Sequence, residues 1–370
     1  MTTAFALQIK YGAFSKLKDF DPEKPLNILA VRLSAMGDCL LVLPTLRRIC
    51  AHRPHWKIHW LISKQWLPLF VNQPIECIGI DKPKNIKNYC DLAAIWRPKK
   101  IDVVLAMQAN LRVNLLYYAV HGDFTLGFDN DRAKEGHSWF IDNSIPAKQQ
   151  HLYDGFQAFA DYLMVPPMKP SWELSISLEA KHWIEKYSLQ LNSDKKRIGL
   201  AIAASKLERT PYPEFYHAVI QLLIQKYDAQ IILIGGKSLI EIQQLKQLQK
   251  LLPNEWPNIQ NWVGSTSLTQ LMALVKSLDI LIAPDSGTVH LATALNIPVI
   301  GLYAIAPSDL SGPYLHREWT IDHYVKASEY FHHMPEQSQR SWKRVHNREA
   351  MQLITVDNIA KKIKILLEKK

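Results

Sequence analysis

Short apolar runs rich in β-branched residues alternate with segments of helical periodicity along most of this chain, and the whole alternation occurs twice. Successive strands separated by helices pair in parallel, so this pattern predicts α/β domains with helices on both faces of each sheet. The expected strands are 27–33, 58–63, 102–107 and 124–128 in the first set, and 197–203, 230–236, 279–285 and 298–303 in the second.

The length of 370 residues exceeds what one hydrophobic core usually fills, which favours two domains. A proline-rich break at 165–170 suits a boundary between them. Two doubly wound domains joined in this way would face a central cleft, because such sheets bind ligands at the carboxyl ends of their strands. The expected divisions are an N-terminal arm at 1–26, a first Rossmann-like domain at 27–170, a linker region at 171–194, a second Rossmann-like domain at 195–325, and a tail at 326–370 with a final helix at 356–367 that packs back on the N-terminal domain.

The formal net charge of +10 favours polyanionic partners. The basic residues are dispersed and no nucleic-acid motif accompanies them, so phosphorylated substrates or an anionic membrane face are favoured over nucleic acid. The four cysteines lie in the first quarter of the chain without CxxC spacing, which predicts reduced thiols in a cytoplasm. No apolar run approaches the roughly 20 residues of a membrane span, and the start MTTAFALQIKYG lacks the pattern of a secretory signal.

The stretch APDSGTVHLATALNIPVIGLY combines the end of an apolar strand with the start of a helix. Helix N–H groups and the positive end of the helix dipole form an anion site at such a start. Gly287 would let a phosphate approach the backbone, Ser286 and Thr288 would add hydroxyl donors, and His290 lies in the first turn behind Asp285. The structural alternative is that Ser286 only caps the helix and His290 only packs in the core.

Two further stretches follow strands of the second half. The loop AASKLERTPYPEFY offers Ser205, Lys206 and Arg209, whose charges would neutralise a diphosphate leaving group, or would simply belong to a solvated loop. Gly235 and Gly236 end another strand and would permit a nucleotide to come close, although a pair of glycines is a weak signal.

In the first half, RLSAMGD stands between a strand and the helical run CLLVLPTLRRIC. Gly37 permits a tight turn and Asp38 begins the helix. As an N-cap, Asp38 would stabilise the helix by about 1 kcal/mol. As a general base, it would remove a proton from an acceptor hydroxyl.

Four segments resemble glycosyltransferase family 9, the ADP-heptose:lipopolysaccharide heptosyltransferases. RLSAMGDCLLVLPTL and DSGTVHLATALNIPVIGLY are similar to the two signature segments, in the right order and at about the right separation. MQANLRVNLLYYAVHGDFTLGFDNDRAKEG and NWVGSTSLTQLMALVKSLDILIAPDSG are similar to the segments that lie between the signatures. The resemblance covers residues 27 to about 314 and resumes in the final helix.

The resemblance implies the GT-B architecture and the transfer of heptose from ADP-heptose to the lipopolysaccharide inner core, with inversion and without a metal. It assigns the acceptor to the first domain and the nucleotide sugar to the second. Asp38 matches the catalytic base, and the phosphate-binding lysine of the family falls at Arg209 or Lys206. The implied donor-binding residues are Lys206, Arg209, Gly235, Gly236, Asp285, Ser286, Gly287, Thr288 and His290, and the acceptor-binding candidates are Ser34, Gly37, Gln108, Arg112 and Arg132.

The resemblance also implies a setting: a monomer without cofactor, peripheral to the cytoplasmic face of the inner membrane of a Gram-negative bacterium, with no nucleic-acid partner. Two alternatives stay open, namely a related enzyme that uses another nucleotide sugar and a non-catalytic nucleotide-sugar-binding protein. The N-terminal arm, with apolar residues among lysines, would either lie on the membrane or form a poorly ordered extension.

Some positions depart from the family pattern. Met107 precedes Gln108 where relatives often have an acidic residue, and an arginine stands at 209 where lysine is usual. The pair Asp129 and Asp131 imitates the DxD of metal-dependent glycosyltransferases, but its position favours a turn and a helix start. The tail at 316–348 lacks the cysteines of many relatives, and its adjacent histidines at 332–333 are expected on a solvated loop.

Overall fold

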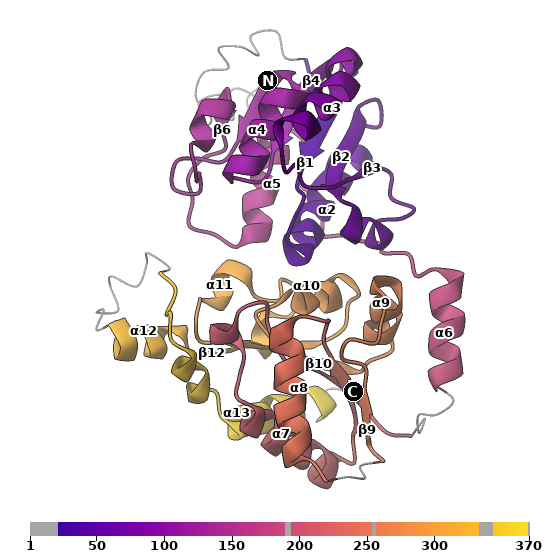
Figure 1. The fold of residues 1–370 in the computed structure, drawn as a ribbon, viewed down its shortest axis with the longest axis vertical. Coiled ribbons are helices and arrows are strands. Elements are labelled where there is room, and N and C mark those ends of the chain that lie inside the picture. Colours follow the sequence, from indigo (N-terminus) through magenta and orange to yellow (C-terminus); the bar gives the residue numbers. More distant parts are fainter. Residues whose placement is uncertain (1–20, 189–193, 254–256, 333–342, 369–370) are drawn as a thin grey trace. The chain divides into compact units, whose positions relative to one another are not determined.

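The chain divides into two compact units, Met1–Ser175 and Ile176–Lys370 (Figure 1). The structure is a computed structural model, and it describes residues 21–188, 194–253, 257–332 and 343–368. Most of the N-terminal arm, residues 1–20, and His333 lie outside what it describes. His332, which was expected on a solvated loop with His333, is instead the last residue of a helix that begins at Tyr324. The boundary between the units lies within the region expected to be a linker, which itself contains a helix, α6 (Leu178–Ser188).

The first unit contains a parallel sheet of six strands in the order β3-β2-β1-β4-β5-β6. Its middle strands are buried on both faces, which is why they appear in the sequence as continuous apolar runs. The strands are β1 (Asn27–Val31), β2 (Lys57–Ser63), β3 (Glu76–Ile80), β4 (Ile101–Ala106), β5 (Gly122–Gly127) and β6 (Asn143–Ser144).

Helices cover this sheet in two packed pairs, α2 with α5 and α3 with α4. The α3–α4 pair shares a buried cluster with Leu29, Val31 and Val104, so the alternate residues of these strands face the other pair. On that other side, the buried Arg48 of α2 donates to Asp161 of α5 at 2.6 Å and ties the two helices together. The helices are α2 (Met36–His52), α3 (Ile86–Trp96), α4 (Leu111–Val120) and α5 (Leu152–Tyr162), with 3₁₀ turns η1 (Lys64–Leu69), η2 (Arg97–Lys99) and η3 (His137–Phe140).

The second unit repeats the architecture with strands in the order β12-β11-β10-β7-β8-β9, all parallel. Each unit is therefore a doubly wound, Rossmann-like domain, as the strand–helix alternation predicted. The strands are β7 (Arg197–Ala201), β8 (Gln230–Ile234), β9 (Ile259–Asn261), β10 (Ile280–Pro284), β11 (Val299–Tyr303) and β12 (Ile321–Asp322).

The helices of the second unit include α12 (Tyr324–His332), within the stretch 314–353 whose sequence pattern indicates no clear element, and α13 (Val356–Glu368), which the sequence predicted at 356–367. The helices are α6, α7 (Pro213–Tyr227), α8 (Leu239–Leu251), α9 (Leu268–Lys276), α10 (Gly287–Ala294), α11 (Ser308–Ser311), α12 and α13, with 3₁₀ turns η4 (Leu207–Arg209), η5 (Arg317–Trp319) and η7 (Arg348–Leu353).

The final helix α13 packs differently from the expectation. The sequence analysis placed it against the N-terminal domain, whereas its apolar face lies in the core of the second unit. Ile359, Ile363 and Leu366 recur at helical spacing and join the buried cluster of that unit, where α13 contacts α7. A helix with a single apolar stripe can bury that stripe against one neighbour, and for α13 this neighbour is α7.

The order of the strands creates one reversal in each sheet. In the first unit the chain proceeds from β1 to β2 and β3, and then returns to place β4 on the other side of β1. In the second unit the same reversal lies between β7 and β10. Ligands of doubly wound sheets bind beyond the carboxyl ends of the strands at such a switch point.

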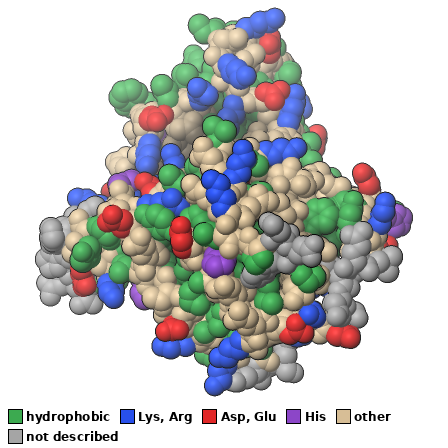
Figure 2. Space-filling model, turned by 60° about the horizontal axis from the view of Figure 1, so that its bottom comes forward, with side chains coloured by type: hydrophobic (Ala, Val, Ile, Leu, Met, Phe, Trp, Pro, Cys, Tyr) green, Lys and Arg blue, Asp and Glu red, His purple; other side chains and the backbone are tan. Residues whose placement is uncertain are grey.

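Basic side chains are spread over the face shown in Figure 2, with hydrophobic side chains between them, rather than gathered in one patch. Among the described helices, none has both the length and the apolar content that crossing a bilayer requires.

Candidate active site

The turn from β1 to α2 holds Asp38 inside the helix, not at its cap. Helix α2 begins at Met36, and Ala35 is its N-cap residue. The expectation that Asp38 begins the helix as its N-cap is therefore wrong by three residues. Its Oδ2 accepts the backbone N–H of Ala35 at 3.1 Å, so the carboxylate closes the first turn from within. Gly37 is buried in the same turn.

Arg32 forms an ion pair with Asp38 that the sequence analysis did not foresee. One of its amino groups contacts Asp38 Oδ2, and the other donates to the carbonyl of Met107 at 2.7 Å. Its guanidinium also lies 5.4 Å from the ring centroid of Phe156. These contacts hold Oδ2, whereas Oδ1 has no hydrogen-bond partner among the described residues. The signal in the sequence for this ion pair was Arg32 itself, a charged residue directly after the apolar strand β1.

Gln108 joins the loop after β4 to the loop after β1 across the reversal of the sheet. Its buried side-chain oxygen accepts the N–H of Leu33 at 2.8 Å and that of Ser34 at 3.2 Å. Its amide nitrogen donates to the Ser34 hydroxyl at 3.4 Å. The Tyr117 hydroxyl donates to the Gln108 carbonyl at 2.6 Å, and burial raises the pKa of that phenol. Gln108 and Ser34, both expected to bind the acceptor, therefore act first on the shape of the Asp38 turn.

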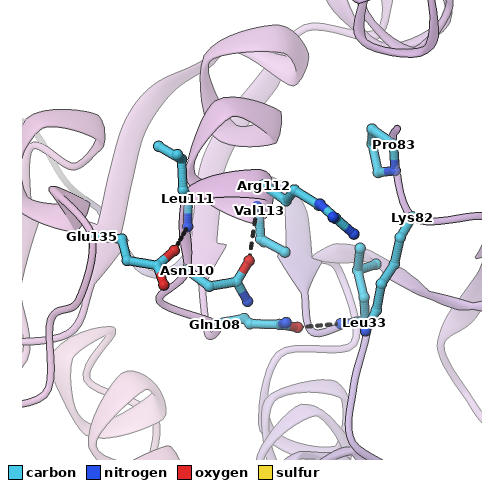
Figure 3. Close-up of a pocket in the computed structure, with 9 residues that line it drawn as sticks. All are labelled: Leu33, Lys82, Pro83, Gln108, Asn110, Leu111, Arg112, Val113 and Glu135. Atoms are coloured by element: carbon cyan, nitrogen blue, oxygen red, sulfur yellow. Dashed lines mark hydrogen bonds between the residues drawn. The ribbon is translucent and has the colours of Figure 1, made fainter. Parts of the chain in front are cut away.

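A pocket of about 450 Å³ opens beside this junction (Figure 3). Arg112 extends from the first turn of α4 toward the side formed by Lys82 and Pro83. Neither Arg112 nor Lys82 belongs to an ion pair in the described part of the chain, so both charges are available to an anionic ligand. The pocket is lined by Leu33, Lys82, Pro83, Gln108, Asn110, Leu111, Arg112, Val113 and Glu135.

Arg132, the remaining acceptor candidate, is not among the residues that line this pocket. It forms an ion pair with Asp129, donates to the Pro146 carbonyl at 2.8 Å and stacks on Phe128. Asp129 also accepts the backbone N–H of Asp131 at 3.0 Å. Both Asp129 oxygens are thus engaged within a turn, which agrees with the interpretation of this pair as a turn. Among the described residues, no three His, Cys, Asp or Glu side chains are grouped as metal ligands.

In the second unit, Arg209 bridges the same kind of reversal. It donates to Asp285 Oδ2 at 2.8 Å and to the Ser205 hydroxyl at 3.2 Å. The Arg209 and Asp285 side chains are only 15% and 14% exposed, so the pair is largely shielded from water. Lys206, in contrast, is exposed. The geometry therefore brings Arg209, rather than Lys206, to the loop that ends β10.

Ser286, between Asp285 and helix α10, carries a side-chain hydroxyl that caps nothing in this helix. Ser286 is the N-cap residue of α10, but its side chain makes no capping hydrogen bond. Its Oγ is buried and has no hydrogen-bond partner among the described residues. The Ser286 hydroxyl therefore does not make the capping hydrogen bond that the structural alternative expected. Gly287 and Thr288 form the first turn at intermediate burial, and His290 is 7% exposed.

The backbone of the glycine pair after β8 is hydrogen-bonded to the side chain of Glu241. The Gly236 N–H donates to Glu241 Oε1, and a Cβ on Gly236 would lie 3.0 Å from Glu241 Oε2. Glu241 also accepts from the backbone N–H and the hydroxyl of Ser238, with which it forms a capping box. The sequence analysis missed Glu241, although the S-x-x-E spacing at the start of α8 was a readable signal. A Cβ on Gly235 would meet Val263 at 3.1 Å.

Comparison with known proteins gives the family of this fold. Residues 92–338 match the model of glycosyltransferase family 9 (heptosyltransferase). The lipopolysaccharide core heptosyltransferase OpsX of Haemophilus influenzae is 29% identical over 309 residues, which cover 83% of this chain and 87% of the relative. Lipopolysaccharide heptosyltransferase 2 of Escherichia coli is 27% identical over 315 residues, which cover 80% and 88%.

Solved structures show the same fold at low sequence identity. A glycosyltransferase family 9 protein from Veillonella parvula superposes with a TM-score of 0.74 at 19% identity, covering 93% of this chain and 98% of that one. The E. coli heptosyltransferase WaaC with ADP superposes with a TM-score of 0.64 at 19% identity, covering 93% and 99%.

Proposed function

The chain belongs to glycosyltransferase family 9, the heptosyltransferases, and on that premise we propose that it transfers a heptose from ADP-heptose to the inner core of lipopolysaccharide. Relatives named lipopolysaccharide core heptosyltransferase and lipopolysaccharide heptosyltransferase cover most of the chain. The observation that carries the proposal is that both signature turns lie at the switch point of their own sheet. Asp38 follows β1 beside Gln108 after β4, and Asp285 follows β10 beside Arg209 after β7.

Asp38 is the proposed general base. Because Arg32 and the Ala35 N–H occupy Oδ2, the other oxygen, Oδ1, is the one that accepts the proton of the attacking hydroxyl. The acceptor oxygen then bonds to the anomeric carbon of the heptose while the bond from that carbon to the diphosphate oxygen breaks. Attack from the side opposite to the leaving group inverts the anomeric centre.

The donor side must stabilise the negative charge that grows on the departing ADP. The N-terminus of α10 presents backbone N–H groups, and the buried Ser286 hydroxyl adds an unsatisfied donor. Arg209, held by Asp285 and Ser205, adds a fixed positive charge. Preorganised charges of this kind stabilise a leaving group where it develops, which supports a reaction without a metal.

The acceptor side is the pocket of the first unit. Arg112 and Lys82 border it, and their charges suit the carboxylates and phosphates of an inner-core acceptor. We further propose that the protein acts as a monomer at the cytoplasmic face of the inner membrane of a Gram-negative bacterium, where such an acceptor is made.

The test is incubation of the protein with ADP-heptose and truncated core acceptors, read by mass spectrometry. A product heavier by one heptose is expected from the wild type, and none from Asp38→Ala, while that variant still binds ADP. Turnover by Asp38→Ala would remove Asp38 from the mechanism. Thermal-shift measurements with ADP-, GDP- and UDP-sugars test the donor, because only a ligand of the native state raises its stability. A shift with a GDP- or UDP-sugar alone would favour a relative with another donor, and binding without product would favour a non-catalytic protein.

A further inference from the structure

The outward face of α4 is apolar, which is the reverse of a normal surface helix. Four of its ten residues are exposed, and three of these are Leu111, Leu115 and Tyr118. Their exposed fractions are 51%, 41% and 72%, and their spacing places them in one stripe. Asn114, a polar residue of the same helix, is fully buried. Amphipathic helices of soluble domains usually point their polar residues outward.

Trp139 is a further exposed aromatic residue, in the 3₁₀ turn that packs on α4. The 3₁₀ turn η3 packs on α4, where the ring of His137 lies 2.8 Å from the side-chain oxygen of Asn114. Trp139 follows two residues later and is 86% exposed. Its ring lies against Gly136, since a Cβ at that glycine would be 3.0 Å from it. We call Leu111, Leu115, Tyr118 and Trp139 together the α4 face.

Three basic residues lie beside the α4 face. Arg97 lies 5.9 Å from the ring centroid of Tyr118. Arg112 is exposed in the first turn of α4, and Lys134 is exposed in the segment whose carbonyl groups accept from Asn114. Glu135, in the turn that precedes η3, is an acidic neighbour of α4 and accepts the N–H of Leu111 at 2.5 Å. The rim is therefore more positive than negative.

We propose that the α4 face docks on the surface of an anionic lipid bilayer. Exposed tryptophan and tyrosine rings favour the boundary between headgroups and acyl chains, leucines favour the acyl side, and a basic rim complements anionic headgroups. A protein partner would also cover apolar side chains, but the three cations beside them favour the anionic lipid surface.

The position of the acceptor pocket supports this choice, and this step rests on the proposed function. Leu111 belongs to the α4 face and also lines the pocket, together with its neighbour Arg112. The pocket continues to Gln108 and Leu33 beside the Asp38 turn. A lipid-linked acceptor could keep its acyl chains in the bilayer under α4 while its sugars occupy the pocket.

The experiment is co-sedimentation of the full-length protein with vesicles of phosphatidylethanolamine and phosphatidylglycerol, compared with phosphatidylcholine vesicles. The test variant combines L115S, Y118S and W139S, none of which lines the pocket. The control combines L178S, L239S and Y330S, three comparably exposed apolar residues of the second unit. The test variant is expected to lose about tenfold or more in vesicle affinity, or about 1.4 kcal/mol, whereas the control keeps wild-type affinity. Binding to the anionic vesicles should also weaken as salt rises.

Thermal unfolding and ADP binding establish that both variants are folded. Equal sedimentation of the test variant and the wild type overturns the proposal, as does a wild type that does not bind vesicles. It is also overturned if deletion of residues 1–20, and not the α4 variant, abolishes binding. A wild type that dimerises through α4 would mean that a second copy covers this face. Because co-sedimentation needs neither donor nor acceptor, its result is independent of whether heptose transfer occurs.

Discussion

Replacement of Arg209 by glutamine should separate the two cations that the sequence left as alternatives for the diphosphate site. Arg209 is fixed by Asp285 at 2.8 Å and by Ser205 at 3.2 Å beside the start of α10. Lys206 lies in the same loop but is exposed. The structure therefore predicts a large loss for Arg209→Gln and a small loss for Lys206→Gln.

The magnitudes follow from the surroundings of each charge. A hydrogen bond to a charged group contributes about 1.5–3 kcal/mol, so Arg209→Gln should weaken ADP binding by roughly 10- to 150-fold. Because charge on the diphosphate grows during transfer, kcat should fall further, by about 10²–10³-fold. Lys206→Gln removes an exposed charge that water screens, so its effect on ADP affinity should stay below about fivefold.

Arg209→Lys tests the geometry of the charge separately from its sign. Lysine keeps the positive charge but loses the planar fork that reaches Asp285 and Ser205 together. We expect it to recover part of the ADP affinity and less of kcat, because the charge is present but is no longer held in place.

Calorimetry with ADP and steady-state kinetics with ADP-heptose measure these effects. Thermal unfolding is the control, because Arg209→Gln leaves the largely buried Asp285 without its partner and lowers stability as well. The reasoning is refuted if Lys206→Gln loses more ADP affinity than Arg209→Gln in proteins that are both folded at the assay temperature.

Three further predictions concern the first unit. Arg32→Ala releases Oδ2 of Asp38 and should lower kcat by about 10- to 100-fold while ADP affinity is unchanged; steady-state rates equal to the wild type would contradict this. Gln108→Leu leaves two backbone N–H groups unpaired and should destabilise the first unit by about 2–4 kcal/mol in denaturant unfolding, whereas Gln108→Glu, which keeps an acceptor oxygen, should lose less. Burial lowers the pKa of His137 from 6.5 to about 4, so the neutral ring, which accepts the N–H of Phe128, is the native form. Its contribution is complete above pH 6.5, because neither state is then protonated; as pH falls toward about 4 only the unfolded state binds the proton, and stability should drop by up to about 3 kcal/mol. Hydrogen exchange of the Phe128 amide from pH 7 to 4 measures this loss, and His137→Gln should show a smaller pH dependence if the assignment is correct.

The sequence predicted the middle of each sheet and missed its edges. The four strands expected in each half are β2, β1, β4 and β5 in one sheet and β11, β10, β7 and β8 in the other, which are the four inner strands. Helices cover both faces of these strands, so they form apolar runs. The outer strands β3, β6, β9 and β12 are half-exposed or very short; β6 and β12 have two residues each. Such strands carry no periodic signal.

The expected strands also run too far at their carboxyl ends. The runs 27–33, 197–203, 230–236 and 279–285 end one or two residues beyond the strands that they predict. Leu33, Ile202 and Ala203 remain buried after their strands stop. The residues therefore stay apolar beyond the point where the hydrogen-bonded ladder ends, because the loops at this edge of each sheet are also buried. The sequence shows no change of composition that would mark the end of the strand.

The polar contacts that shape the site could not be predicted from the sequence pattern, for a different reason. Asp38 and Asp285 could be recognised as residues at strand-to-helix turns, but Gln108 and Arg209 acquire their partners through the sheet order, as does Arg32 for its bond to the Met107 carbonyl. The Gln108–Leu33 bond spans 75 positions and the Arg209–Asp285 bond spans 76. Spacing along the chain cannot rank such pairs before the order of the strands is known.

The near-equality of these two spans reflects a shared topology, which in the proposed mechanism serves two kinds of chemistry. Each bond connects the loop after the first strand of a unit to the loop after its fourth strand, across the reversal. In the first unit the bridge is a neutral amide, which leaves Arg32 to hold one oxygen of Asp38 and the other oxygen free to take a proton. In the second unit the bridge is itself a cation and a carboxylate, and it brings the positive charge of Arg209 to the start of α10. A base needs an oxygen without a partner, whereas a leaving diphosphate needs fixed positive charge. In the proposed mechanism the same switch point therefore provides either one, according to whether an amide or an arginine connects its two loops.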